Sequence, residues 1–172
     1  MRVALALPSA SLLQGCASSA RDDTPPRKEA TRLSISLAVD SDANCDIKGR
    51  GAPLLLRFYE LKSASAFQEA DFFTLQDHDR AALGADLLAV DPFILRPGET
   101  RTIRRQAHAE TTALGIFAAF RDLPNAVWRI THTMPTAPDA HWYRTVMPAV
   151  RAQLALRVQA RSVAMTDTAL PS

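Results

Sequence analysis

Residues 32–61 read RLSISLAVDSDANCDIKGRGAPLLLRFYEL, and this stretch decides the fold class. Apolar side chains occupy every second position of 32–39, and they line one face again through 54–61. A period of two predicts β-strands that each bury one face. The connection at 40–53 is far longer than the about two to five residues of a hairpin, so it is predicted to be a long loop between two strands.

The remainder of the chain adds five predicted strands, at 87–96, 100–105, 114–120, 127–131 and 154–158. Arg96-Pro97-Gly98-Glu99 has the composition of a tight turn between the first two of them. Seven short strands at near-regular spacing predict a mainly β protein built as a two-sheet β-sandwich.

A small helical insert is predicted at about 65–84, between the second and third strands. Ser65 is expected to cap a helix ending at Ala70, and Asp77 a second helix ending at Gly84. The large apolar side chains of the insert are expected to pack it on the sheet: Phe67, Phe72, Phe73, Leu75 and Leu83.

The composition is that of an ordinary globular domain. The chain has 172 residues, 47% of them hydrophobic and 22% charged, which is enough apolar material for one core. Twenty Lys and Arg residues against 18 Asp and Glu residues leave a net charge of +2. This balance gives no reason to expect a nucleic acid partner.

The amino terminus is typical of a lipoprotein signal. A short basic start precedes an apolar segment at 3–13, and Leu13-Gln14-Gly15-Cys16 resembles a bacterial lipobox. That resemblance implies cleavage after residue 15 and covalent lipid on Cys16, which anchors the chain through acyl chains. The residue after the Cys is Ala17 and not the Asp that resembles an inner-membrane retention signal, which favours sorting to the outer membrane. The alternative is an ordinary buried or disulfide-bonded Cys16.

The expected domain organisation follows from this signal. Residues 1–15 are the signal peptide, and residues 16–30, polar and Pro-bearing, form the lipid anchor and a flexible tether. Residues 31–172 form the β-sandwich domain. No stretch approaches the roughly 18 apolar residues of a membrane-spanning helix.

No constellation of side chains predicts metal binding or catalysis. Asp77-His78-Asp79 is interpreted as the solvated start of a helix, because adjacent helical residues point in different directions. His132 and His141 flank a Pro-bearing loop without further ligand-type residues at a suitable spacing. The chain has no nucleophile elbow and no phosphate-binding glycine loop. We therefore expect no metal, no cofactor other than the lipid, and no enzymatic activity.

Two further features stay open at this stage. Trp142 and Tyr143 are either interface anchors or a cover for one edge of the core. Cys45 is left as a lone thiol once Cys16 is acylated, so it is either a crosslink point or an inert, partly buried group.

The loop at 40–53 is interpreted as a recognition element, because a long, charged, Gly-containing loop on a rigid scaffold is well suited to binding. Arg50 is its candidate hot spot. The alternative is a connector without fixed structure.

Several segments, taken in order, resemble the TssJ family of type VI secretion lipoproteins. They are Asn44 to Pro53 running into Leu56 to Leu61, Phe67, Ala70 to Phe72, Leu75, Leu83 to Leu87, Leu95 to Glu99, Leu114 to Ile116, Phe120 to Leu123, and Trp128-Arg129. The resemblance covers roughly 33–129 and the lipobox, whereas the carboxy-terminal third matches only through its last strand. Cys45 departs from the family pattern.

The resemblance implies a transthyretin-like sandwich with a small helical insert. It also implies a partner, the periplasmic carboxy-terminal region of the inner-membrane protein TssM, bound through the loop between the first two strands. By position the partner-binding residues here are Asn44, Asp46, Ile47, Lys48, Gly49, Arg50, Gly51 and Pro53. The rival interpretations are a generic envelope lipoprotein and a ligand-binding module or hydrolase on a transthyretin-like scaffold.

Overall fold

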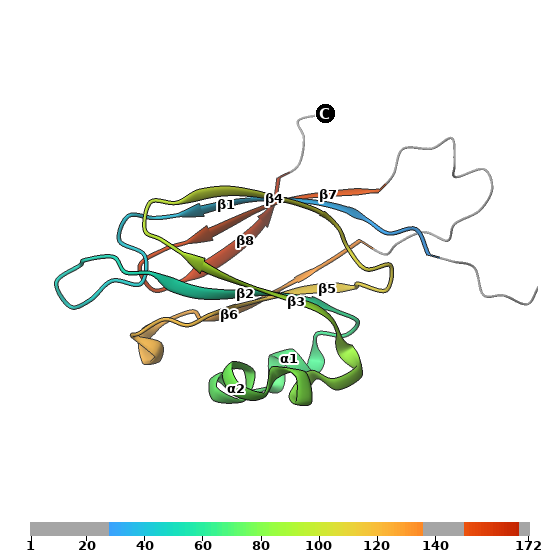
Figure 1. The fold of residues 1–172 in the computed structure, drawn as a ribbon, viewed down its shortest axis with the longest axis horizontal. Coiled ribbons are helices and arrows are strands. Elements are labelled where there is room, and N and C mark those ends of the chain that lie inside the picture. The colour runs from blue at the N-terminus through green and yellow to red at the C-terminus, as the bar shows by residue number, and fades with distance from the viewer. Residues whose placement is uncertain (1–27, 136–149, 169–172) are drawn as a thin grey trace, which may run out of the picture.

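The computed structural model describes residues 28–135 and 150–168, and they form two four-stranded sheets packed face to face (Figure 1). One sheet has the strand order β4-β1-β7-β8, with β1 Arg32–Val39, β4 Thr100–Gln106, β7 Arg151–Val158 and β8 Val163–Asp167. The other has the order β3-β2-β5-β6, with β2 Leu54–Leu61, β3 Leu87–Leu95, β5 Ala113–Ala118 and β6 Arg129–Thr133. The predicted mainly β, two-sheet sandwich is confirmed.

The core lies between the two sheets and follows the period of two. In β1 every second residue is buried, and β7, its parallel neighbour, repeats the pattern. β5 instead is buried throughout, because one of its faces meets the other sheet and the second meets the helical insert. A strand covered on both sides has a continuous apolar sequence.

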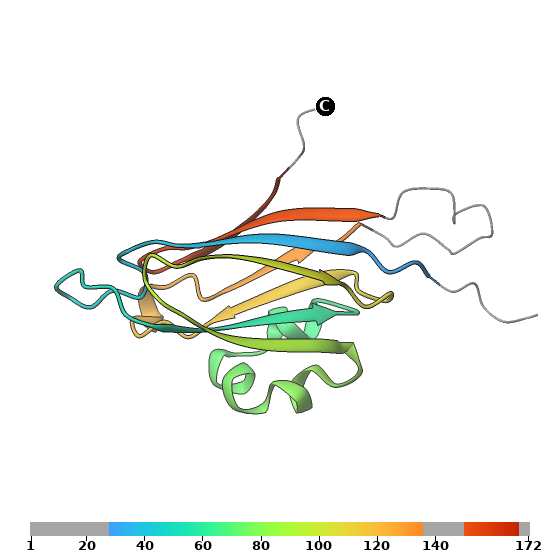
Figure 2. The same ribbon diagram turned by 45° about the horizontal axis from the view of Figure 1, so that its top comes forward.

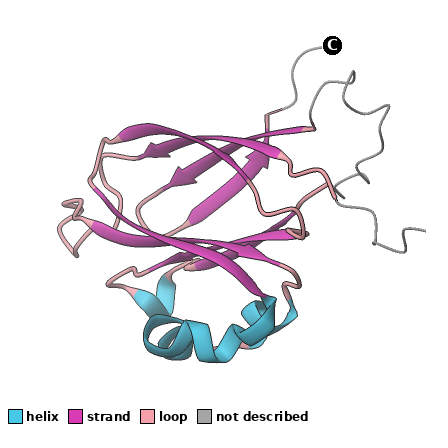
Figure 3. Ribbon diagram, turned by 45° about the vertical axis from the view of Figure 1, so that its right-hand side comes forward, coloured by secondary structure: helices cyan, strands magenta, loops and turns pink. Residues whose placement is uncertain are grey.

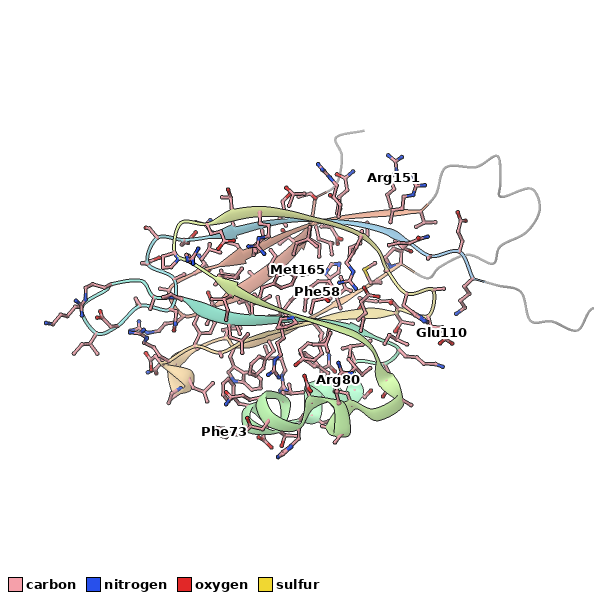
Figure 4. All side chains as sticks on the ribbon, in the orientation of Figure 1. Phe58, Phe73, Arg80, Glu110, Arg151 and Met165 are labelled. Carbon is pink, nitrogen blue, oxygen red and sulfur yellow. The ribbon has the colours of Figure 1, made fainter. Side chains whose placement is uncertain are left out.

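The helical insert consists of α1 Ser65–Glu69, α2 Phe72–Leu83 and the 3₁₀ turn η1 Gly84–Asp86. It covers the outer face of the β3-β2-β5-β6 sheet (Figure 3). Phe67 and Leu75 are fully buried there, as predicted. Phe73 is 64% exposed, so its predicted packing role is wrong. It lies on the outer side of α2 (Figure 4).

The predicted helix starts need correction. Ser65 is the first helical residue, and the hydroxyl of Ser63 accepts its N–H at 3.3 Å. The second helix begins earlier than expected, because Asp71 caps it by accepting the N–H of Thr74 at 2.9 Å. Asp77 is therefore not its cap, although the helix is kinked at the next residue, His78. Its predicted end at Gly84 is confirmed.

Strand boundaries shift by a few residues, and one strand was not predicted. The turn at 96–99 is present, closed by the N–H of Glu99 donating to the carbonyl of Arg96 at 3.0 Å. β8 is the additional strand and pairs antiparallel with β7. Only Val163 of β8 is buried, so its sequence VAMTD lacks the clear alternation of the other strands.

The two ends of the sandwich differ. The described chain enters at one end, at residue 28, whereas the 40–53 loop projects from the opposite end in two views (Figures 1 and 2). β1 is the only element between them in sequence. Within the described residues, no helix is both long and apolar enough to cross a bilayer.

Candidate partner-binding loop

The loop at 40–53 crosses from β1 in one sheet to β2 in the other. Its first residue is held on both sides. The N–H of Asp40 donates to the carbonyl of Val158 at 2.8 Å, and the carboxylate of Asp40 pairs with the Arg157 guanidinium at 3.0 Å. The neighbouring turn also contacts it, because the N–H of Gly98 donates to the carbonyl of Asp40 at 3.3 Å. The loop therefore rises from a fixed base.

Asn44 joins the two arms of the loop from inside. Its side-chain amide donates to the carbonyl of Pro53 at 2.8 Å, and its Oδ1 accepts the N–H of Arg121 at 2.9 Å. The residue is 5% exposed and has a φ of +54°, a conformation that Asn tolerates better than most residues. Asn44 thus shapes the loop and presents no surface to a partner.

The tip of the loop is closed by Asp46. Its Oδ1 accepts the backbone N–H groups of Lys48 at 2.8 Å and of Arg50 at 3.0 Å. Its Oδ2 accepts the Arg50 Nε–H at 2.9 Å, and the backbone N–H of Asp46 donates to the carbonyl of Arg50 at 3.0 Å. The hydrogen bonds from Arg50, the backbone one foremost, lower the pKa of the Asp46 carboxyl.

Glycines allow the chain to make this turn. Gly49 has a φ of +75°, which side-chain-bearing residues rarely adopt. At Gly51 a Cβ would lie 2.4 Å from the backbone oxygen of Ser41 and 3.0 Å from the ring of Pro97. Gly51 therefore permits the loop to pack on the turn between β3 and β4.

The closed tip presents three side chains to solvent. Ile47 is 99% exposed, the Arg50 side chain is 75% exposed, and Lys48 is exposed as well. Isolated apolar surface residues are common, but Ile47 stands on a turn already ordered by its own hydrogen bonds. The sequence analysis located this loop but did not predict the Asp46–Arg50 ion pair. The signal for it was present in the sequence, because opposite charges stand four residues apart on either side of Gly49.

The eight predicted residues thus fall into two groups. Asn44, Asp46, Gly49 and Gly51 hold the loop's shape, and Pro53 contributes its carbonyl while its side chain is exposed. Ile47, Lys48 and Arg50 form the exposed tip. Cys45 belongs to neither group and is a buried free thiol.

The other candidate side chains have structural partners. Asp79 accepts the Tyr59 hydroxyl at 3.0 Å and lies 3.2 Å from Arg57, which ties α2 to β2, and burial raises the pKa of Tyr59. His132 of β6 lies 3.2 Å from Asp167 of β8. The described part of the chain contains no group of three metal-ligating side chains. Cys16, His141, Trp142 and Tyr143 lie outside the described residues.

Comparisons with known proteins agree on one family. The family model for type VI secretion lipoproteins, described as VasD, EvfM and TssJ, matches residues 31–161. The crystal structure of the type VI lipoprotein TssJ1 from Pseudomonas aeruginosa is 36% identical, with a TM-score of 0.71, covering 86% of this chain and 100% of that one. A search of curated proteins gave no match.

Two further solved structures share the fold. Lip from Serratia marcescens, a membrane-bound component of the type VI secretion system, is 25% identical, with a TM-score of 0.70, covering 79% of this chain and 97% of that one. A chain of a type VI membrane complex is 17% identical, with a TM-score of 0.64, covering 79% and 98%, and shows the fold alone. The resemblance found in the sequence is confirmed, as is the expectation of a non-enzymatic component. The chain belongs to the TssJ family of type VI secretion lipoproteins.

Proposed function

We propose that this chain anchors the trans-envelope complex of the type VI secretion system by binding the periplasmic carboxy-terminal region of TssM through the 40–53 loop. Acyl chains on Cys16 hold it in the periplasmic leaflet of the outer membrane. The observation that carries the proposal is Ile47, 99% exposed on a turn that Asp46 and Arg50 close. A pre-ordered loop loses little conformational freedom on binding, which favours affinity.

The placement of the loop supports this role. The described chain begins, at residue 28, at one end of the sandwich and the loop leaves from the other (Figure 1). With the tethered end at the outer membrane, the loop is free to face a partner that rises from the inner membrane. The family's place in a secretion system and the shared fold of a chain from a type VI membrane complex support the same assembly.

The exposed tip defines the chemistry of the partner. Ile47 fits an apolar recess, and the nearby cations Lys48 and Arg50 favour carboxylates around that recess. Arg50 already pairs with Asp46 at 2.8 Å, whereas Lys48 makes no ion pair with any described residue. Lys48 is therefore the cation whose charge is most available to a partner.

The test is capture of the full chain by the periplasmic region of TssM. Ile47→Asp should weaken capture about tenfold to a hundredfold, because a buried anchor residue contributes about 2 kcal/mol or more. Phe73→Asp is the matched control, since it also places a carboxylate at an exposed apolar position, but on α2. Equal capture by wild type and Ile47→Asp would reject the loop as the contact.

The anchor is tested separately. Wild-type chain should incorporate radiolabelled palmitate and fractionate with the outer membrane, and Cys16→Ser should do neither. In detergent solution, the TssM region should capture the Cys16→Ser variant as well as it captures the wild-type chain. Retention of the unlabelled variant in the outer membrane would refute anchoring through Cys16.

A further inference from the structure

The outward face of the β4-β1-β7-β8 sheet has an unusual charge pattern. Its outward-facing positions hold only Ser, Thr, Ala, Gln and Arg side chains, and the four strands place no carboxylate on this face. Among its arginines, Arg157 is neutralised by Asp40 at 3.0 Å. The other three, Arg32, Arg104 and Arg151, are exposed and make no ion pair with described residues.

These three arginines lie together. Arg32 of β1 stands directly opposite Arg151 of β7, and Arg104 of β4 stands opposite Ser34, one pair along the same face. Directly opposite residues are about 5 Å apart at Cβ and diagonal ones about 7–8 Å. With Ser34 and Gln153 they line one open depression. Figure 4 shows Arg151 pointing away from the sandwich.

Such a cluster is unfavourable without an external partner. Like charges opposite each other on a sheet destabilise it, and no acidic side chain among the described residues of this face offsets them. Guanidinium groups pair well with phosphate, to which each donates two parallel hydrogen bonds. Ser and Gln side chains between them add further donors. The chemistry of the surface therefore fits a layer of phosphates.

The position of the cluster points to the source of those phosphates. Arg32 and Arg151 are the first residues of their strands, at the end of the sandwich where the described chain begins. Residues 17–31 separate the cluster from Cys16, and the flexible tether expected from their composition would span about 20 Å on average. An acyl anchor at Cys16 thus keeps the cluster within reach of the membrane surface.

We propose that Arg32, Arg104 and Arg151, here named the arginine face, rest on anionic phospholipid headgroups of the membrane that holds the anchor. The inference rests on the acyl anchoring proposed above. Contact at this end orients the sandwich on the membrane, and it leaves the 40–53 loop at the opposite end free for its partner.

The experiment uses the full acylated chain in vesicles that contain a headgroup-attached quencher. A fluorophore is placed at Thr102→Cys, on the same face, in a Cys45→Ala background, with Phe73→Cys as the probe on the far side. Quenching at position 102 should rise when roughly a third of the phosphatidylcholine is replaced by phosphatidylglycerol, and about 0.5 M NaCl should abolish the rise. The probe at position 73 should not respond.

The triple variant Arg32→Gln, Arg104→Gln, Arg151→Gln should lose this response. Each basic residue at an anionic surface contributes about a fivefold factor, so the face-down equilibrium should fall about a hundredfold. The matched control is Arg80→Gln, Arg96→Gln, Arg121→Gln, which removes three other exposed arginines and the same net charge. This control should behave as wild type.

Each alternative result has a distinct meaning. If both triple variants lose quenching equally, or the arginine-face variant keeps it, the arginine face is not the lipid contact. If wild-type chain fails to stay on vesicles of either composition, the acyl anchor itself is refuted and the inference falls with it. Capture by the TssM region should be the same for wild type and the arginine-face variant, which separates this surface from the loop.

Discussion

At the scale of single residues, Asn44 does most to hold the loop in place. Its amide connects Pro53 at the end of the loop with Arg121, which lies 77 positions away in the sequence. The sequence placed Asn44 in the loop but suggested a contact with the partner. Its structural role was not predictable, because nothing local to Asn44 indicates that the backbone of Arg121 is its neighbour.

Asn44→Ala should lower the free energy of unfolding by about 3 kcal/mol. The change leaves the part-buried N–H of Arg121 without its acceptor, which costs about 1–3 kcal/mol, and it places Ala at a positive φ, which costs about 1 kcal/mol more. Urea unfolding measures the difference. Asp42→Ala, at an exposed position of the same loop, should change stability by less than about 0.5 kcal/mol. Similar values for both variants would contradict this role for Asn44.

The pH dependence of the tip follows from Asp46, whose pKa is lowered from its usual 3.8 mainly by the backbone hydrogen bond from Arg50. Because the folded pKa lies below the unfolded one, the stabilisation is complete above about pH 3.8 and is lost as the pH falls through the folded value. The amide resonances of Lys48 and Arg50 should therefore stay constant from pH 8 to 5 and move only below about pH 3.8. A midpoint above that value would show that Asp46 does not close the turn.

At the scale of elements, the helical insert docks through one close approach. Gly115 of β5 lies under Phe67 of α1, where a Cβ would be 2.9 Å from the ring. The sequence predicted that Phe67 packs on the sheet, but it did not show which strand residue makes room. Alternation of apolar residues located most strands because burial of one face imposes it. β8 was not found, because an edge strand with one buried residue leaves no such pattern.

Gly115→Ala should destabilise the fold by about 1–3 kcal/mol, since Phe67 is fully buried and has little room to move. Phe67→Leu removes the ring atoms that the new methyl group meets. In that background, the loss of unfolding free energy caused by Gly115→Ala should be smaller by about 1 kcal/mol or more. A double-mutant cycle of unfolding free energies measures this difference. Additive effects would show that the ring is not the obstacle.

At the scale of the whole molecule, the two sheets are joined along one side by a buried ionic contact. Arg105 of β4 lies 2.5 Å from Oε1 of Glu60 of β2 and also pairs with Asp91 of β3. The other oxygen of Glu60 accepts the N–H of His108 at 2.6 Å and the hydroxyl of Thr111 at 3.1 Å. The sequence analysis assigned Glu60 no role, and only the assembled sandwich shows that its charge is paired across the two sheets.

Glu60→Ala should reduce the free energy of unfolding by about 3–5 kcal/mol, because it removes one partner of a buried ion pair and strands two hydrogen-bond donors. Glu110→Ala breaks the half-exposed pair with Lys62 at 3.3 Å and should change stability by less than about 1 kcal/mol. Chemical denaturation compares the two. A loss at Glu60 no larger than that at Glu110 would mean that the cross-sheet contact contributes little.

The central position of β1 has a mechanical consequence. Within the described residues, β1 is the one element between the start of the chain at residue 28 and the loop, and it is hydrogen-bonded to β4 along one side and to β7 along the other. Under the proposed anchoring and partner binding, tension would run parallel to this strand and load both rows of hydrogen bonds in shear. Bonds stretched together resist far better than bonds peeled apart one after another, so a small sandwich can transmit a pull without unravelling.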